Sequence, residues 1–258
     1  MRILLTNDDG IHAEGLSVLE DIARQFSDDI WVVAPEVEQS GKSRALTLTD
    51  PVRVRQVSEK RFAVRGTPTD CVLLGLMELV DGDAPDLILS GVNRGQNIAE
   101  DTTYSGTIAA AMCGMQHGVR SIALSQSRGF QFPGSLPWDT SRIWGKKALG
   151  PVLDMNWPDN VVININFPDR APEDVTGVEV TRQGFRDENI VHAEQRMDLR
   201  GDSYFWIGYR GKLSQPAEGT DLKAIYAGRV SISPLHVDLT HEDTLVSLRT
   251  GLANAWET

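Results

Sequence analysis

The sequence predicts an α/β fold built around a parallel sheet, and two observations support this prediction. Short apolar runs that end in turn residues recur along the chain, at residues 3–5, 30–34, 87–89 and 122–124. Runs of this length without a polar face are typical of strands that are buried on both sides of a parallel sheet. Helical patterns of apolar residues separate several of these runs, as the crossover connections of such a sheet require.

Length, charge and composition limit the class of protein. The 258 residues suffice for one large α/β domain or for a domain with an appendage. The formal net charge of -11 argues against a nucleic-acid polymer as partner, because contacts to its phosphates need a basic face. Cys71 and Cys113 lack the spacing of a zinc or redox site and fit a reducing compartment. With no signal peptide and no stretch long enough to span a bilayer, we expect a cytoplasmic protein that enters no membrane.

The first apolar run ends in two adjacent carboxylates, Asp8 and Asp9, which Gly10 follows. In open α/β sheets, ligands bind at the carboxyl ends of the strands, where the loops line a crevice. Two neighbouring negative charges repel each other, and burying one of them without a partner is costly. Either solvent or a cation must therefore surround the pair, although an Asx turn that only ends the strand fits the same residues.

The next stretches continue the alternation of helix and strand. Residues 15–26 place apolar side chains along one helical stripe and predict the first crossover helix. Residues 30–35 predict a second buried strand, and the polar loop that follows it, residues 36–44, is a second candidate wall of the site. Alternating side chains over residues 45–64 predict a hairpin that extends or flanks the sheet.

The middle of the chain adds a helix, a strand and a polar loop. Residues 66–70 form a turn with capping residues and lead into a helix over residues 72–80. A third buried strand follows at residues 86–90. The loop after it, residues 91–97, contains glycines and asparagines, which can bring backbone and amide oxygens close to a ligand.

A helix start then follows at Ser105, Gly106 and Thr107, directly before an alanine-rich stretch. Such a start presents hydroxyls, unpaired N–H groups and the positive end of the helix dipole to one spot, which favours phosphate binding. An ordinary N-terminal cap by Ser105 explains the same residues. Residues 121–125 predict a fourth parallel strand.

The second half of the chain is less informative. We expect a helix around Leu149, strands at residues 161–168 and 229–235, and short strands between residues 177 and 209. Exposed aromatic hairpins such as the one predicted around Phe205 often serve subunit association, although a local core fits equally well. Helical spacing predicts a C-terminal amphipathic helix through Leu245, Leu248, Leu252 and Trp256.

Together, these loops supply a set of oxygen ligands. Asp8, Asp9, Ser40 and Asn93 come from three strand ends and offer carboxylate, hydroxyl and amide oxygens. Such a set suits Mg²⁺ or Mn²⁺ better than zinc, which prefers nitrogen and sulfur. A phosphate-binding turn at Ser105 beside that cation implies a phosphate ester as substrate, with water attacking phosphorus.

Several motifs in this order resemble the SurE (stationary-phase survival protein) family of 5'-nucleotidases. The resemblance covers most of the chain, and the order of the motifs makes it specific where each alone is weak. The motifs are Asn7-Asp8-Asp9-Gly10, Ser40-Gly41-Lys42-Ser43, Gly66-Thr67-Pro68-Thr69-Asp70-Cys71, Ser90-Gly91-Val92-Asn93 with Gly95 and Asn97, Tyr104-Ser105-Gly106-Thr107, and residues 228–235.

The resemblance implies a Rossmann-like, three-layer α/β fold over residues 1–258 as a single domain. It also implies hydrolysis of nucleoside monophosphates with a divalent metal held by the residues that here are Asp8, Asp9, Ser40 and Asn93. A cytoplasmic homodimer or homotetramer is implied as well, in which C-terminal hairpin and helix segments within residues 177–258 are exchanged between subunits.

These inferences give a working mechanism. Asp8 and Asp9 are the expected catalytic residues, and the substrate phosphate is bound by the Ser105-Gly106-Thr107 turn with help from Asn97. Lys42 would add a positive charge near the leaving group. The sequence leaves open whether water or Asp8 itself attacks phosphorus, and it leaves open hydrolysis at the 3' as well as the 5' position.

Other functions fit parts of the pattern. A phospho-receiver domain also has an acid pair after its first strand, but it needs a lysine at a later strand end, which residues 121–127 do not offer. A dinucleotide dehydrogenase is disfavoured, because no GxGxxG follows the first strand. A nucleotide-binding regulatory module without turnover stays open, and measured phosphatase activity would separate it from the enzyme.

Overall fold

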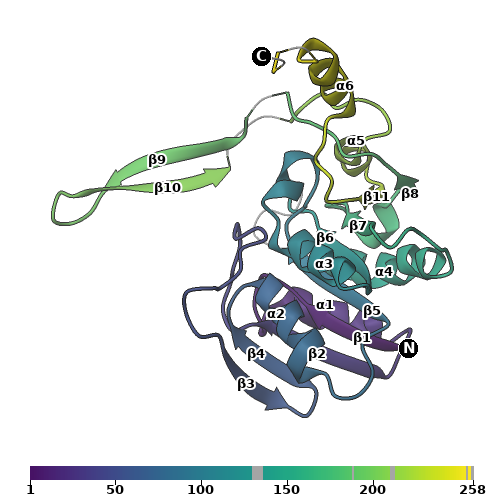
Figure 1. Ribbon diagram of the computed structural model, residues 1–258. Coiled ribbons are helices and arrows are strands. Elements are labelled where there is room, and N and C mark those ends of the chain that lie inside the picture. Colours follow the sequence, from purple (N-terminus) through teal and green to yellow (C-terminus); the bar gives the residue numbers. More distant parts are fainter. Residues whose placement is uncertain (130–135, 188, 210–212, 254, 257–258) are drawn as a thin grey trace.

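The computed structural model describes residues 1–129, 136–187, 189–209, 213–253 and 255–256 (Figure 1). Its strands are β1 (Arg2–Thr6), β2 (Asp29–Pro35), β3 (Arg53–Ser58), β4 (Arg61–Arg65), β5 (Leu87–Arg94), β6 (Arg120–Gln126), β7 (Val162–Phe167), β8 (Val178–Val180), β9 (Val191–Met197), β10 (Ser203–Tyr209) and β11 (Val230–Leu235). Its helices are α1 (Glu14–Ala23), α2 (Pro68–Leu74), α3 (Gly106–Gln116), α4 (Trp138–Leu153), α5 (Asp221–Tyr226) and α6 (Glu242–Gly251). Shorter helical segments are η1 (Gly75–Leu79), η2 (Ala99–Thr103) and η3 (Pro172–Asp174).

In the described residues, nine strands form one sheet in the order β3-β4-β2-β1-β5-β6-β7-β11-β8. The strands from β4 to β7 in this order are parallel to one another. β3 and β11 run antiparallel to β4 and β7, respectively. The predicted α/β class with a parallel-rich sheet is therefore confirmed. The chain first winds from β1 to β2 and later returns to β5 on the other side of β1, so a ligand crevice is expected beside β1.

Helices cover both faces of the sheet and give three layers (Figure 1). On one face, α1 and α4 pack over Ile3 and Leu5 of β1. On the other face, α2 and α3 pack around Leu4. Because successive side chains of a strand point to opposite faces, the unbroken apolar run of β1 is buried on both sides.

Two helices begin where the sequence predicts helix starts. The Thr67 hydroxyl accepts a hydrogen bond from the Asp70 N–H, and the Asp70 carboxylate accepts one from the Thr67 N–H, so α2 starts with a capping box. The Ser105 hydroxyl oxygen accepts a hydrogen bond from the Ile108 N–H at 3.0 Å and caps α3.

The predicted hairpin over residues 45–64 is only partly correct. β3 and β4 are its strands, whereas residues 45–52 have no regular structure. The Thr47 N–H and hydroxyl both donate hydrogen bonds to the Asp70 carboxylate, which binds this stretch to the start of α2 rather than to a strand. β4 also pairs in parallel with β2 and so extends the main sheet.

The predicted C-terminal helix is shorter than its pattern. α6 ends at Gly251, so Leu252 and Trp256 lie beyond it, and residues 254 and 257–258 lie outside the described part of the chain. None of the α6 side chains is buried. Within the residues that the structure describes, the apolar stripe therefore has no partner surface.

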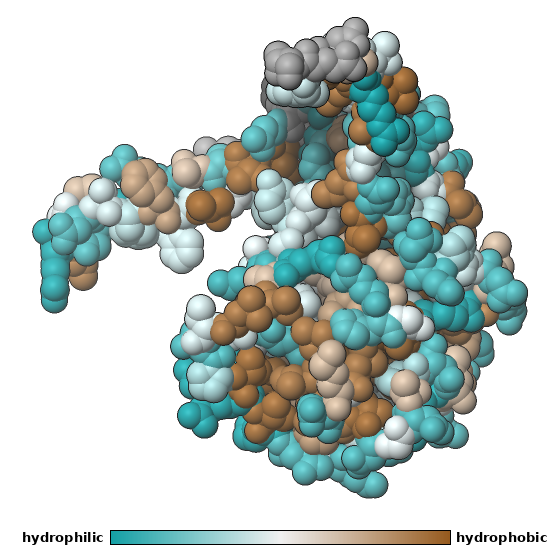
Figure 2. Space-filling model, viewed as in Figure 1, coloured by the Kyte–Doolittle hydropathy of each residue, from teal (hydrophilic) through white to brown (hydrophobic). Residues whose placement is uncertain are grey.

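An antiparallel arm of β9 and β10 projects from the body (Figure 1). One of its faces carries Val191, Phe205, Ile207 and Tyr209, whose exposed fractions lie between 42% and 77%. Figure 2 shows apolar residues along this arm as well as on the body. Among the helices that the structure describes, none is both long and apolar enough to cross a membrane.

Candidate active site

The acid pair lies in a closed turn at the carboxyl end of β1. The Asn7 side-chain nitrogen donates to the Gly10 carbonyl at 2.9 Å, and the Gly10 N–H donates to the Asn7 side-chain oxygen at 3.2 Å. Gly10 has φ +105°, a backbone conformation that residues other than glycine rarely adopt. The sequence Asn7-Asp8-Asp9-Gly10 therefore fixes the direction in which both carboxylates leave the strand.

Asp8 packs against the N-terminus of α3. A Cβ atom on Gly106 would lie 2.8 Å from the Asp8 Cβ and 3.0 Å from its Oδ2, so only glycine lets the helix start approach this closely. The Thr107 hydroxyl donates a hydrogen bond of 2.6 Å to Asp8 Oδ1. The two stretches that the sequence singles out as a carboxylate site and a phosphate turn are thus in direct contact.

Burial makes the Asp8 carboxylate hard to ionise. Burial, and then the negative charge of Asp9, raise the pKa of Asp8 to about 7, while the hydrogen bond from Thr107 acts in the opposite direction. Burial also raises the pKa of Asp9, against the hydrogen bond that its Oδ2 accepts from the Arg94 N–H at 2.9 Å. Two partly desolvated carboxylates side by side favour a bound cation, since a cation would offset both costs.

The other two predicted metal ligands lie around the same opening. The loop that carries Ser40 is attached to the acid pair, because the Gln39 N–H donates to the Asp8 carbonyl at 2.7 Å. Asp8, Ser40 and Asn93 line one pocket of about 470 Å³. Asp9 and Ser40 line a second pocket of about 670 Å³, which adjoins the first because Ser40, Arg94 and Arg128 line both.

The free oxygens of this set fit a hard cation. Among the described residues, Asp8 Oδ2 and Asp9 Oδ1 accept no hydrogen bond, and the Asn93 amide uses only its nitrogen, which donates to the Gly95 carbonyl at 2.8 Å. The Ser40 hydroxyl donates to Glu38 at 2.9 Å and keeps its lone pairs. No group of three or more His, Cys, Asp or Glu side chains in the described chain could hold a metal, so a cation here would depend on mixed oxygen ligands.

The predicted phosphate turn faces the smaller pocket through Ser105. Gly106 and Thr107 are buried behind it, with Thr107 bound to Asp8. The backbone N–H groups at this helix start give the pocket a positive end close to the carboxylates. An anion bound here would lie beside the candidate cation.

Asn97 is buried and joins the phosphate turn to the sheet. Its side-chain nitrogen donates to the Ser125 hydroxyl at 2.8 Å and, at 3.4 Å, to the Thr107 hydroxyl. Its own N–H donates to Asn166 Oδ1, and its carbonyl accepts hydrogen bonds from the side chains of Asn164 and Asn166. Asn97 is also one of the residues that line the smaller pocket.

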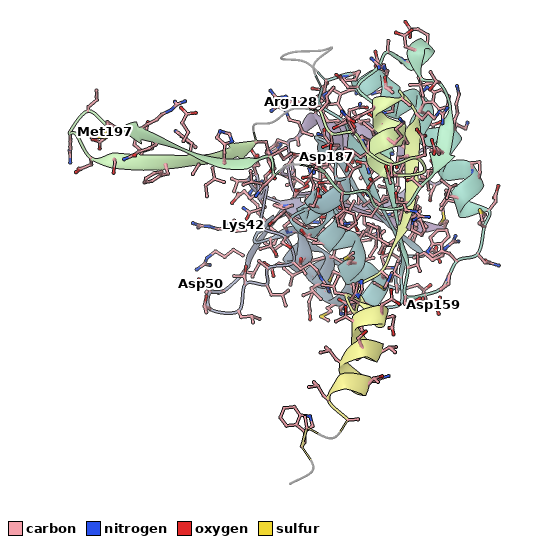
Figure 3. All side chains as sticks on the ribbon, turned by 90° about the horizontal axis from the view of Figure 1, so that it is seen from above. Lys42, Asp50, Arg128, Asp159, Asp187 and Met197 are labelled. Atoms are coloured by element: carbon pink, nitrogen blue, oxygen red, sulfur yellow. The ribbon has the colours of Figure 1, made fainter. Side chains whose placement is uncertain are left out.

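Lys42 is a predicted site residue that the structure does not bring to either pocket. It is exposed, lines neither pocket, and lies at the outside of the molecule in Figure 3. Arg94 and Arg128 line both pockets instead. Neither arginine is among the residues predicted from the sequence, although the position of Arg94 inside the candidate loop 91–97 is a usable signal for it.

The pocket also contains residues from far along the chain. Tyr104, which precedes the phosphate turn, lines the smaller pocket together with Ile190 and Tyr209 of the arm. Local sequence gave no signal for Ile190 or Tyr209, because only the tertiary fold brings the arm beside the site.

Comparisons with known proteins find one family. A family model described as survival protein SurE matches residues 3–189. The 5'-nucleotidase SurE of Hyphomonas neptunium is 67% identical over 96% of this chain and 98% of its own length. The 5'-nucleotidase SurE of Caulobacter vibrioides is 57% identical over 99% of this chain and 97% of its own.

A solved structure gives the same result for the fold. The crystal structure of SurE protein from Aquifex aeolicus superimposes with a TM-score of 0.80 at 33% sequence identity, covering 97% of this chain and 99% of that one. The fold, the family model and the full-length relatives agree, and this chain therefore belongs to the survival protein SurE family.

Proposed function

We propose that this chain is a phosphomonoesterase that hydrolyses nucleoside 5'-monophosphates to nucleoside and phosphate, with Mg²⁺ or Mn²⁺ as cofactor. Relatives named 5'-nucleotidase SurE that are 52–67% identical over nearly the whole chain support this. The structural observation that carries the proposal is the packing of Asp8 against Gly106. This packing supports the proposal, because a carboxylate that could bind a cation lies beside a helix start that could bind an anion, and a phosphate ester needs both.

Asp8, Asp9, Ser40 and Asn93 hold the cation in this proposal. When bound, the cation supplies positive charge that polarises the phosphoryl group and stabilises charge developing in the transition state. Thr107 fixes the orientation of the Asp8 carboxylate through its hydrogen bond of 2.6 Å. The Arg94 N–H fixes Asp9 in the same way.

The substrate phosphate binds at the start of α3. The Ser105 hydroxyl and the first N–H groups of the helix face its oxygens, and Gly106 and Thr107 shape the turn. The Asn97 side-chain oxygen can only accept hydrogen bonds. It therefore contacts the phosphate where a phosphate oxygen carries a proton, or through a bridging water. Lys42 adds charge near the leaving group if its loop closes over the pocket.

Water attacks phosphorus in this mechanism, and the acid pair anchors the site. The near-complete burial of Asp8, which is 4% exposed, supports an anchoring role. Isolation of a phosphorylated Asp8 from a quenched reaction would instead make this residue the nucleophile.

The experiment that tests the proposal compares hydrolysis of 5'- and 3'-nucleoside monophosphates by the wild type and by Asp9→Asn. The reactions are run in EDTA and then with Mg²⁺ or Mn²⁺ restored. We expect metal-dependent phosphate release by the wild type and release at the metal-free level by Asp9→Asn. Asp159→Asn is a matched control, because this exposed carboxylate lies away from the site (Figure 3). Tight nucleotide binding without release under any condition would favour the regulatory module.

We also infer a homodimer or homotetramer in the cytoplasm, with residues 177–258 as the oligomerisation part of a single domain. The exposed apolar face of the arm supports this inference, because contiguous apolar surface on a soluble protein commonly marks an association site. The partners in this proposal are the nucleotide substrate and further copies of the chain, with neither nucleic-acid polymer nor membrane.

A further inference from the structure

The root of the arm forms part of the substrate pocket. Tyr209 is the last residue of β10 and pairs with Val191 at the start of β9. Tyr209 and Ile190 line the pocket of about 470 Å³ that also contains Asp8 and Ser105. A ligand whose phosphate binds at the start of α3 would therefore have the arm within reach of its remaining atoms.

Two tyrosines offer aromatic surface in this pocket. Tyr104 lies directly before the phosphate turn, and Tyr209 comes from the arm, with exposed fractions of 55% and 66%. Among the described residues, neither ring stacks on another aromatic ring, since the observed aromatic pairs lie elsewhere. Their faces are available to a flat ligand, and aromatic side chains stack on any nucleobase because every base has a π-face.

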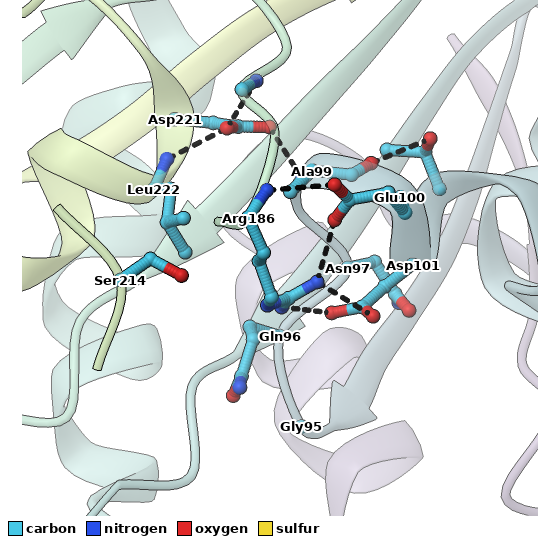
Figure 4. A network of polar contacts seen from close by, with 12 residues as sticks. Gly95, Gln96, Asn97, Ala99, Glu100, Asp101, Arg186, Ser214, Asp221 and Leu222 are labelled. Carbon is cyan, nitrogen blue, oxygen red and sulfur yellow. Dashed lines mark hydrogen bonds and ion pairs between the residues drawn. The ribbon is translucent and has the colours of Figure 1, made fainter. Parts of the chain in front are cut away.

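A buried ion cluster fixes the position of the wall that carries Tyr104 (Figure 4). The Arg186 side chain, only 7% exposed, donates to both carboxylate oxygens of Asp101, at 3.0 and 2.6 Å. It also donates to Glu100 at 3.0 Å, while the Arg186 N–H donates to the other Glu100 oxygen at 2.7 Å. Both acids belong to η2, which directly precedes Tyr104.

A third carboxylate, that of Asp221, holds the same wall from behind. Asp221 accepts hydrogen bonds from the N–H groups of Ala99 at 2.9 Å, Gly184 at 2.8 Å and Leu222 at 2.6 Å (Figure 4). Ala99 has φ +50°, an uncommon conformation that these contacts stabilise. The wall with Tyr104 and the stretch that leads into the arm are therefore attached to each other, which sets both sides of the pocket.

This pocket contains charged groups that suit the phosphate, such as Arg94 and Arg128, and also groups that suit an uncharged base. Asp101 lines it, but Arg186 neutralises this carboxylate, and Gln96 and Asn97 add uncharged hydrogen-bonding groups. The adjacent larger pocket contains Glu14 and Glu38, and its aromatic residue, Trp138, packs against Gly15. The Trp138 ring is therefore partly used by the core, whereas the two tyrosines are not.

We propose that Tyr104 and Tyr209 bind the base of a nucleoside monophosphate, and that Tyr209, which the arm supplies, favours nucleotides over phosphate esters that carry no base. This inference rests on the proposed function, since it names the place of the nucleoside in the same site. Base and phosphate then bind to different parts of the molecule: the phosphate to the sheet and α3, the base to η2 and the arm.

The test compares Tyr209→Ser with the wild type on a nucleoside 5'-monophosphate and on ribose 5-phosphate, which has the same phosphate ester and no base. Loss of one base stack corresponds to a rise in KM of about tenfold or more for the nucleotide. We expect KM for ribose 5-phosphate and kcat for both substrates to change little. Tyr209→Phe keeps the ring and should restore the wild-type KM.

Tyr204→Ser is the matched control, because Tyr204 lies on the opposite face of the same strand and outside the pocket. Assembly state is measured for every variant. Equal rises in KM for both substrates, or no rise with Tyr209→Ser, would overturn the proposal. Calorimetric titration of the same two ligands measures how much the base contributes to binding, and it does not depend on turnover. If the wild type hydrolyses neither ligand, the proposed activity is refuted, and the test of base binding still applies.

Discussion

The central strands and the arm use similar side chains for opposite purposes. Ile3, Leu4 and Leu5 of β1 are fully buried between two helical layers, whereas Phe205 and Ile207 of β10 are 60% and 77% exposed. A two-stranded hairpin without a covering layer is marginal in water by itself. The sheet therefore stabilises the charged half of the site with its own core, while the arm exposes apolar surface that is available to another molecule.

The two regions also differ in what they contribute to catalysis. The sheet supplies the ends of β1 and β5 with Asp8, Asp9 and Asn93, whose positions are fixed by packing. The arm supplies Tyr209, whose position depends on contacts at its root. In the proposed mechanism, the chemical step that needs accurate positioning therefore takes place at the packed sheet, and the exposed arm contacts the base.

Truncating a buried side chain of the sheet gives the largest effect that we expect. Leu89 of β5 is fully buried, so Leu89→Ala should lower the free energy of unfolding by about 3 kcal/mol through lost transfer energy and a cavity. Ile207→Ala removes a similar side chain that is 77% exposed, and its effect should stay below about 0.5 kcal/mol. Urea unfolding of both variants measures the difference, and equal losses would remove the contrast between the regions.

A change at the contact between β1 and α3 should mainly affect activity. A Cβ atom on Gly106 would lie 2.8 Å from the Asp8 Cβ, so Gly106→Ala must displace the helix start or the carboxylate. A misplacement of this kind should lower kcat/KM by about a hundredfold. Gly150→Ala is the control, since the nearest atom there, of Phe26, is 4.0 Å away. Wild-type kcat/KM in Gly106→Ala would show that this contact is not required.

In the arm, we expect a polar substitution to change assembly rather than folding. Phe205→Ser removes an exposed ring from the apolar face, so the melting temperature of the isolated chain should hardly change. The dissociation constant of the oligomer should rise, because a central aromatic residue of an interface contributes up to about 2 kcal/mol or more. Analytical ultracentrifugation over a concentration series measures this shift. An unchanged dissociation constant would separate the arm from oligomerisation.

The smallest effect that we expect concerns stability at low pH. It involves Asp29, at the start of β2 and so at the opposite ends of the strands from the site. Hydrogen bonds from Lys60 and Arg2 lower the pKa of Asp29 to about 2. The ionised Asp29 carboxylate, bound by Lys60 and Arg2, therefore stabilises the fold above the pKa of about 4 that Asp29 has in the unfolded chain. This contribution is lost as the pH falls toward 2. In melting curves recorded at a series of pH values, Asp29→Asn should reduce the fall of the melting temperature between about pH 4 and pH 2. Glu194→Gln, in an exposed ion pair of the arm, should leave this pH dependence unchanged.

Much of the sheet and the charged half of the site follow from local sequence. Apolar runs predict β1, β2, β5 and β6, because strands buried on both faces favour continuous apolar side chains. The position of Asp8, Asp9 and Asn93 at strand ends then follows from the rule that parallel strands end at one edge of the sheet. Glycine at position 106 becomes meaningful only with the structure, which shows the carboxylate that it touches.

The remaining features depend on contacts between distant residues. Arg128 and Tyr209 enter the pocket through tertiary structure, and no periodicity marks them. Thr47 is bound by Asp70, so the alternating pattern of residues 45–52 produces no strand. The stripe of α6 correctly predicts a helix, but it gives no information on whether its partner surface belongs to this chain.

The hydrogen bond between Asp8 and Thr107 joins residues that are 99 positions apart. Translation proceeds from the N-terminus at roughly 5–20 residues per second, so the ribosome needs roughly 5–20 s more to make Thr107 after Asp8. During that time the nascent β1 has left or is leaving the exit tunnel without α3 to cover it. Asp221, which holds Ala99, is made another 122 positions after that alanine. The acid pair is thus synthesised first, and its surroundings are completed close to the end of translation.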